Sequence, residues 1–149
     1  MERLADFRFT EAEIEALGDS LDDRTVEWLR DFRFTGDIDG YREGELFFPG
    51  SPVLTVRGGF AECVVLETLV LSVLNHDSAV ASAAARMTSA ADGRPIIEMG
   101  SRRTHEEAAV AAARAAYLTG FAATSNVEAT RRHGVPSAGT SAHSFTLLY

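Results

Sequence analysis

Two short segments carry residue types that could do chemistry, and each follows an apolar run that favours a buried strand. The first is 98–103, Glu-Met-Gly-Ser-Arg-Arg, and the second is 139–145, Gly-Thr-Ser-Ala-His-Ser-Phe. α/β proteins place their functional groups where strands end. The guanidiniums of Arg102 and Arg103 can each hold two oxygens of a phosphate or carboxylate. His143 lies among small residues and hydroxyls. Together the segments predict an anionic substrate and a reactive imidazole.

Alternating strand and helix patterns must position these segments. The expected strands are 95–99, 121–124 and 135–138, and the expected helices are 106–118 and 126–133. Thr104 with Glu107 predicts the start of the first of these helices, and Gly120 its end. Repeated strand–helix units predict parallel strands, and therefore an α/β fold for this part of the chain.

The first third of the chain has a different pattern. Thr10 and Glu13 form a capping box for one short helix, which is expected to stop at Gly18. Asp22 or Asp23 can cap a second helix. Its expected apolar face consists of Val26, Trp28, Leu29 and Phe32. Short apolar runs separated by glycines and a proline between 37 and 57, including 46–48 and 53–56, predict a small antiparallel unit.

An apolar segment follows. Residues 60–74 are apolar almost all round, which predicts a helix that is buried on several sides, and Asp77 is expected to start a separate alanine-rich helix. The run 60–74 is too short and too interrupted by glutamates to predict a membrane span. Residues 1–6 lack the apolar core of a signal peptide.

Bulk properties narrow the classes of function. The 149 residues, 46% of them hydrophobic, suit one globular domain. A net charge of -8 argues against nucleic-acid or membrane-surface binding. The one cysteine, Cys63, cannot form an internal disulfide. We therefore expect a soluble, cytoplasmic protein. The chain ends on the apolar residues 145–149 without a helix cap, which predicts a fragment of something larger.

An ordered series of motifs resembles the nicotinate phosphoribosyltransferase family, a group of type II phosphoribosyltransferases. The motifs are 28–36, 43–49, 66–69, 98–103, 124–127, 134–136 and 139–145. Members of the family are longer than this chain. The resemblance implies an α+β N-terminal part in residues 1–59, helical with antiparallel strands. It also implies that residues 60–149 form the first part of an irregular parallel α/β barrel, which is truncated and incomplete here.

The resemblance also implies an activity. Family members make nicotinate mononucleotide from nicotinate and 5-phosphoribosyl 1-diphosphate in NAD biosynthesis, with ATP hydrolysis and with Mg²⁺ on the diphosphate rather than in a protein metal site. His143 matches their phosphorylated histidine, with Thr140 and Ser144 beside it to stabilise the transferred charge. Arg102 and Arg103 match a basic pair that contacts substrate, and Arg102 is the favoured one. Family members are usually homodimers.

The same residues have plainer interpretations. His143 could be an ordinary loop histidine that bonds Ser144 or the backbone, and the arginines could pair with the glutamates at 106 and 107. The resemblance implies that Ser125 favours nicotinate over nicotinamide, because nicotinamide-using relatives place an acidic residue near this position, but Ser125 could also be a helix N-cap with Glu128. Glu98 could be a site carboxylate, although we favour a role in orienting Arg102.

Three alternatives compete for the whole chain. One is a nicotinamide-specific relative of the same family. Another is an inactive fragment that folds only with a partner chain, such as the missing C-terminal part. The third is a small α/β ligand-binding domain. We expect the chain alone to be inactive, because missing barrel strands would remove substrate contacts and admit water to the site.

Overall fold

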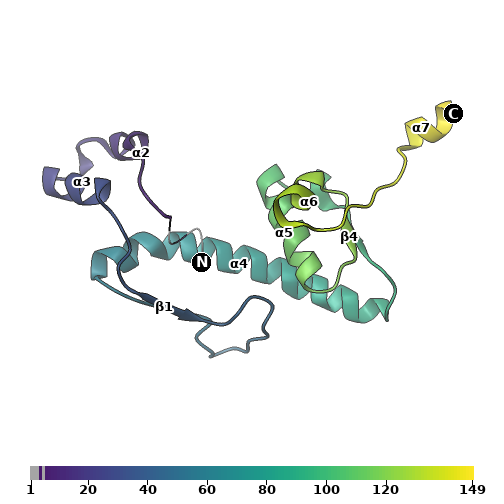
Figure 1. Cartoon of the computed structure of the whole chain (residues 1–149), viewed down its shortest axis with the longest axis horizontal. Coiled ribbons are helices and arrows are strands. Elements are labelled where there is room, and N and C mark those ends of the chain that lie inside the picture. Colours follow the sequence, from purple (N-terminus) through teal and green to yellow (C-terminus); the bar gives the residue numbers. More distant parts are fainter. Residues whose placement is uncertain (1–3, 5) are drawn as a thin grey trace. The chain divides into compact units, whose positions relative to one another are not determined.

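A computed structural model describes residue 4 and residues 6–149, except for the side chain of residue 19. The chain divides into two compact units, 1–67 and 68–149, and each is a mixture of helices with a small sheet (Figure 1). A mixed helix and sheet content is confirmed, whereas an incomplete barrel and a domain boundary at residue 59 stay predictions. The expectation about a signal peptide in residues 1–6 lies largely outside the described residues.

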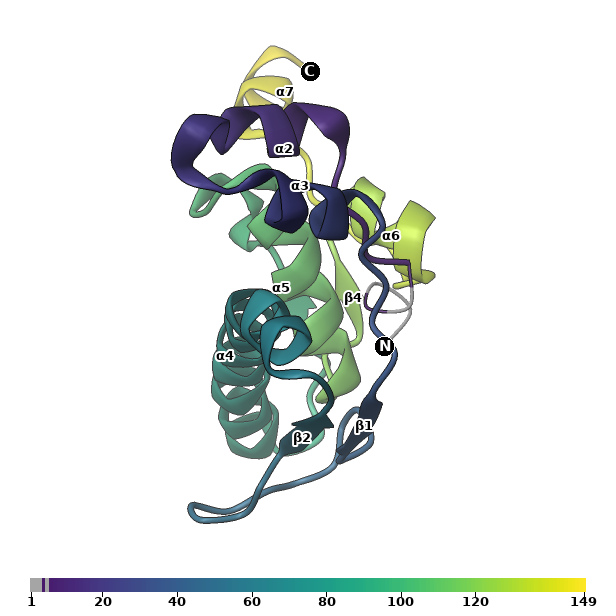
Figure 2. The ribbon, with the colours of Figure 1, turned by 90° about the vertical axis from the view of Figure 1, so that its left-hand side faces the viewer.

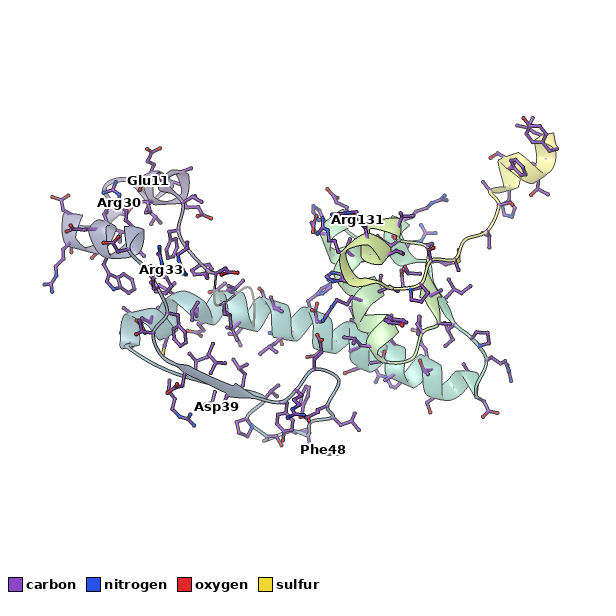
Figure 3. All side chains as sticks on the ribbon, viewed as in Figure 1. Glu11, Arg30, Arg33, Asp39, Phe48 and Arg131 are labelled. Carbon is purple, nitrogen blue, oxygen red and sulfur yellow. The ribbon has the colours of Figure 1, made fainter. Side chains whose placement is uncertain are left out.

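Two short helices begin the first unit. Helix α2 spans Glu11–Ala16 and starts with the expected capping box, in which Thr10 and Glu13 bond each other's backbone N–H. Helix α3 spans Asp23–Arg30, and Asp22 is its N-cap. Figure 3 shows Glu11 and Arg30 side by side, and their charged atoms lie 3.2 Å apart. Because both side chains are exposed, this ion pair adds little to stability.

An aromatic cluster joins α3 and the residues after it to the segment that precedes α2. Phe32 is 1% exposed and packs edge-to-face against three rings, with centroids 5.2–5.9 Å away. The three rings belong to Phe7, Phe9 and Trp28. Such pairs favour this perpendicular geometry. Phe32 lies just beyond the end of α3 and is part of the core, as expected, while Trp28 within α3 remains partly exposed.

The antiparallel unit is a pair of four-residue strands. Strand β1 spans Asp37–Gly40 and strand β2 spans Leu54–Arg57, with Ile38 opposite Val56. The apolar run 46–48 lies in the loop between them rather than in a strand, which corrects the expectation. Phe48, labelled on this loop in Figure 3, is 71% exposed. Leu46 and Phe47 are exposed as well, so the apolar composition of this run did not by itself indicate a strand.

Helix α4 spans Phe60–Ala91 as one continuous helix, so a separate helix starting at Asp77 is wrong. Its apolar stretch is also not buried on several sides: 6% of the most apolar window is buried, although Leu66 is fully covered. Among the described residues, α4 is the one helix long and apolar enough to cross a membrane by length and composition. The helix is longer than the run 60–74, whose shortness was one ground for expecting no membrane span.

The second unit contains the parallel strands. Strand β3 spans Ile97–Glu98 and pairs in parallel with strand β4, Ala123–Thr124. A parallel bridge joins Thr124 to Ser137, so the expected third strand is reduced to a single bridge. The strands are shorter than predicted but they are parallel, as predicted.

Helices follow each strand of this unit. They are η2, a 3-10 turn over Gly100–Arg102; α5, Glu106–Leu118; α6, Val127–His133; and α7, His143–Leu148. Figure 2 shows α5 beside the second half of α4, where Ala84, Ala116 and Phe121 form a buried cluster. A second cluster, Val110, Ala113 and Ala129, packs α5 against α6. Small alanine side chains permit this close approach of the helices.

Candidate functional site

The candidate site lies where β3 and β4 end. Glu98 and Thr124 are register partners at the last positions of these parallel strands. Side chains that are paired across a sheet point to the same face. The turn η2 with Arg102 follows directly after Met99, and Ser125 follows directly after Thr124. Two of the sequence-predicted segments are thus brought to the same edge of one small sheet.

Glu98 has both carboxylate oxygens engaged. Oε1 accepts the backbone N–H of Gly100, the first residue of η2, and Oε2 accepts the hydroxyl of Thr124 at 2.7 Å. The backbone carbonyl of Glu98 also accepts the N–H of Ser125 at 2.9 Å. Glu98 therefore holds the backbone of η2, the arginine turn, which carries Arg102. No ion pair joins it to Arg102 within the described residues, so any effect of Glu98 on Arg102 acts through the backbone.

Arg102 and Arg103 are exposed, and neither forms an ion pair within the described part of the chain. The interpretation that they pair with the glutamates of α5 is wrong for this structure. Glu106 lies 3.6 Å from the His105 imidazole, and Glu107 lies 2.7 Å from the Arg132 guanidinium. Two adjacent guanidiniums that follow a strand end and have no carboxylate partner among the described residues are well placed to receive an anion.

Ser125 is half-buried, and its hydroxyl makes no hydrogen bond to any described residue. The N-cap of α6 is Asn126, whose side-chain oxygen accepts the N–H of Ala129 at 3.0 Å. The plainer interpretation of Ser125 as the cap is therefore wrong, and its hydroxyl is available for another partner. Likewise the N-cap of α5 is His105 rather than Thr104, and no side chain caps that helix.

Thr124 and Asn126 belong to this site and were missed by sequence reasoning. Thr124 is 0% exposed, and it is the one polar residue in the buried set among the described residues. Its hydroxyl donates to Glu98 and accepts the N–H of Asn126 at 3.0 Å. The Asn126 side-chain amide donates to the Ser101 hydroxyl at 3.1 Å. A lone threonine at the end of an apolar strand was the signal in the sequence that could have indicated this network.

The histidine segment is separate from this network. His143 is the first residue of α7, residues 139–149 are all exposed, and Thr140 and Ser144 lie among them. Within the described residues, the His143 imidazole makes no hydrogen bond to Ser144 or to a backbone group, and His143 begins a helix rather than lying in a loop. The structure does not bring His143 into contact with Arg102 or Ser125.

An exposed charge network lies between α5 and α6. Arg132 bonds both Glu107 and Glu128, and Arg131 bonds Glu128 at 2.6 Å. Hydrogen bonds from Arg131 and then Arg132 lower the pKa of Glu128 from 4.5 to about 2. Bonds from Arg132 to Glu107 and then Glu128 raise the pKa of Arg132. These arginines are committed to glutamates, unlike Arg102 and Arg103.

A protein-held metal site is not indicated by the described side chains. Among them, no group of three or more histidine, cysteine, aspartate or glutamate residues is placed to hold a metal ion.

Comparisons of the sequence with known proteins all match one enzyme family. A family model described as the nicotinate phosphoribosyltransferase N-terminal domain matches residues 1–75. A Mycobacterium tuberculosis protein named nicotinate phosphoribosyltransferase pncB1 is 70% identical over all 149 residues. A Bacillus subtilis nicotinate phosphoribosyltransferase is 38% identical over 100% of the chain. This chain spans 33% and 31% of those two relatives.

A solved structure gives the same result. The crystal structure of human nicotinic acid phosphoribosyltransferase matches 99% of this chain with a TM-score of 0.88 at 35% identity. The matched region is 31% of the human chain. The likeness therefore extends through both units and includes every segment of the candidate site.

Proposed function

Because this chain belongs to the nicotinate phosphoribosyltransferase family, we propose that it contributes the N-terminal third of such an enzyme. The reaction joins nicotinate to 5-phosphoribosyl 1-diphosphate, gives nicotinate mononucleotide and diphosphate, hydrolyses ATP alongside and serves NAD biosynthesis. The observation that carries this proposal is the 70% identity along the whole chain to a relative of that name. Arg102 and Arg103, which follow β3 and form no ion pair with any described residue, support it.

Arg102 and Arg103 are proposed to hold the anionic groups of the substrates. Both guanidiniums are exposed and lack carboxylate partners among the described residues. A guanidinium can hold a phosphate or the ring carboxylate of nicotinate by two parallel hydrogen bonds. We favour Arg102, because it is the last residue of η2, whose first residue is held by Glu98. Glu98 then orients the arginine by fixing its turn rather than by touching the guanidinium.

Ser125 is proposed to select nicotinate over nicotinamide. Its half-buried hydroxyl is neutral and uncommitted within the described part of the structure. A carboxylate at this place would repel the carboxylate of nicotinate, whereas a hydroxyl can donate a hydrogen bond to it. The nicotinamide-specific alternative for this chain is less well supported for the same reason.

His143 is proposed to be the phosphorylated histidine. A neutral imidazole nitrogen attacks the γ-phosphorus of ATP, a nitrogen–phosphorus bond forms, and the bond to the β-phosphate oxygen breaks to release ADP. Thr140 and Ser144 lie on the same exposed segment and can donate hydroxyl hydrogen bonds to the transferred group. Hydrolysis of the phosphohistidine then completes the ATP cycle.

Transfer of the ribosyl group needs few protein groups. The bond from ribose C1 to the diphosphate oxygen breaks, and the ring nitrogen of nicotinate forms the new bond to C1. Mg²⁺, when bound with the diphosphate, would neutralise the departing charge. The contribution of this chain is to hold two anions in line with each other, which is catalysis by positioning and by charge stabilisation.

The remaining two thirds of the family length are proposed to complete this site and to cover α4. The apolar stretch of α4 is mostly exposed here, yet the match to the human structure includes 99% of the chain. A core helix of the full-length protein explains that surface better than a membrane span does. We further propose a cytoplasmic homodimer for the full-length form.

The test uses a joined protein, defined as this chain continued by the part of the Mycobacterium tuberculosis relative that lies beyond the matched third. Nicotinate, 5-phosphoribosyl 1-diphosphate, ATP and Mg²⁺ are supplied, and nicotinate mononucleotide is measured. We expect nicotinate mononucleotide from the joined protein and none from the 149-residue chain alone. Arg102→Ala in the joined protein should greatly lower the rate of nicotinate mononucleotide formation. A joined protein that folds and makes no nicotinate mononucleotide would overturn the proposal.

A further inference from the structure

The buried hydroxyl of Thr124 connects the two parts of the candidate site. Thr124 on β4 and Glu98 on β3 are register partners. The Thr124 hydroxyl donates to the Glu98 carboxylate at 2.7 Å and accepts the N–H of Asn126 at 3.0 Å. Since Thr124 is 0% exposed, water cannot replace either bond. One hydroxyl therefore links the end of β3 to the residue that follows Ser125.

The network closes into a ring. From Thr124 it passes through Glu98 to the backbone N–H of Gly100, where η2 begins. It returns from the neighbouring Ser101 hydroxyl to the side chain of Asn126 at 3.1 Å. Arg102 and Ser125 each lie directly beside a member of this ring and are not themselves members through their side chains. The ring therefore fixes the two backbone positions from which these side chains extend.

We propose that Thr124 is a positioning residue, which sets the arginine turn relative to Ser125 so that one anionic substrate can meet both. This inference rests on the proposed function of Arg102 and Ser125. A hydroxyl is required, because valine fills the same volume but can neither donate to Glu98 nor accept from Asn126. Misplacement of a binding group by about 1 Å can cost as much as about 100-fold in rate.

Three variants of the joined protein test this. Thr124→Val removes the hydroxyl, whereas Thr124→Ser keeps it. Phe121→Leu weakens the buried cluster of the same unit without touching the ring. We expect Thr124→Val to raise KM for nicotinate about tenfold with a smaller change in kcat, and Thr124→Ser to stay within about threefold of the parent. Phe121→Leu should lower the melting temperature and leave KM near the parent value.

A second measurement does not depend on turnover. Calorimetry measures inorganic diphosphate binding to the joined protein, to Thr124→Val and to Arg102→Ala. We expect both substitutions to weaken binding, although only Arg102 can touch the diphosphate. If the joined protein binds diphosphate but makes no nicotinate mononucleotide, the proposed reaction fails and weakened binding in Thr124→Val still supports the positioning role.

Three results would overturn the positioning role. The first is parental KM and parental diphosphate binding in Thr124→Val. The second is a rise in KM in Phe121→Leu equal to that in Thr124→Val when the two variants lose the same amount of melting temperature, since that would show a purely structural effect. The third is no binding of either inorganic diphosphate or nicotinate by the parent joined protein, because there would then be no anion site for Thr124 to position.

Discussion

Asn126 accepts the backbone N–H of Ala129 through its side-chain oxygen, at 3.0 Å, and so caps helix α6. Ser125, one residue earlier, makes no such bond among the described residues. Loss of a capping side chain costs about 1 kcal/mol. We therefore expect Asn126→Ala to lower the free energy of unfolding by about that amount in urea titrations. Ser125→Ala should change it by less than about 0.5 kcal/mol.

Asn126→Asp separates the two roles of this side chain. An aspartate keeps the accepting oxygen for Ala129 but loses the amide that donates to Ser101. It should restore most of the stability lost in Asn126→Ala. If Ser125→Ala were the more destabilising change, Ser125 would be the working cap and its hydroxyl would not be available to substrate.

Glu128 is expected to make α6 sensitive to acid. Its pKa is lowered to about 2 by Arg131 and Arg132. A carboxylate whose pKa falls on folding stabilises the native state at a pH above the pKa of the unfolded chain. This stabilisation is lost as the pH falls through the pKa of the folded state. Here the stabilisation is fully present above the ordinary value of 4.5 and disappears between 4.5 and about 2.

The comparison is between the parent chain and Glu128→Gln, by urea unfolding at about pH 6 and about pH 3. The variant should be less stable than the parent at the higher pH, and the gap should shrink at the lower pH and in high salt. Glu106→Gln, which removes an exposed carboxylate near His105 instead, is the control. A gap that does not change with pH would contradict the charge network.

Gly36 is required by its distance to a backbone rather than by its dihedral angles. A Cβ at this position would overlap the carbonyl oxygen of Arg57, the last residue of β2. Overpacking of this kind typically costs about 1–3 kcal/mol. Gly36→Ala should destabilise the first unit by about 3 kcal/mol, and Gly59→Ala, which meets Glu62 only at an ordinary 3.8 Å, should be tolerated. Equal effects of the two changes would show that the β1–β2 pair is not packed as described.

Ser125→Asp tests the substrate preference in the joined protein. Two like charges at contact cost several kcal/mol, so kcat/KM for nicotinate should fall at least about tenfold. Ser125→Asn adds similar bulk without charge and should lose much less. Unchanged nicotinate kinetics in Ser125→Asp would remove Ser125 from the specificity argument.

Local patterns in the sequence were sufficient to predict several helices and strands. The capping box of Thr10 and Glu13 and the span of α5 over Glu106–Leu118 are confirmed. Both depend on residues a few positions apart, whose periodicity or side-chain bonds are set by helix geometry alone. The parallel pairing of β3 and β4 is also confirmed, because alternating strands and helices leave few other topologies.

Other structural features depend on contacts between residues that are distant in the sequence, and local sequence patterns do not show those contacts. Asp77 looked like a helix start, yet no glycine or proline interrupts 60–91, and its carboxylate lies 3.0 Å from His76 within α4. Ser125 and Asn126 are both good caps, and only the register of α6 distinguishes them. The bond from Thr124 to Glu98 joins residues 26 positions apart. The apolar surface of α4 is likewise a pattern whose partner lies outside local sequence, and the chain spans 33% of its Mycobacterium tuberculosis relative.

Transfer of label from γ-labelled ATP to His143 tests the central claim most directly. The joined protein and its His143→Ala variant are incubated with labelled ATP and Mg²⁺, and the acid stability of the bound label is measured. We expect acid-labile phosphate on the parent and none on His143→Ala, with Phe121→Leu, which weakens a buried cluster outside the ring, retaining the label as a control for general damage. Label that persists in His143→Ala, or a folded parent that takes up none, would contradict the account.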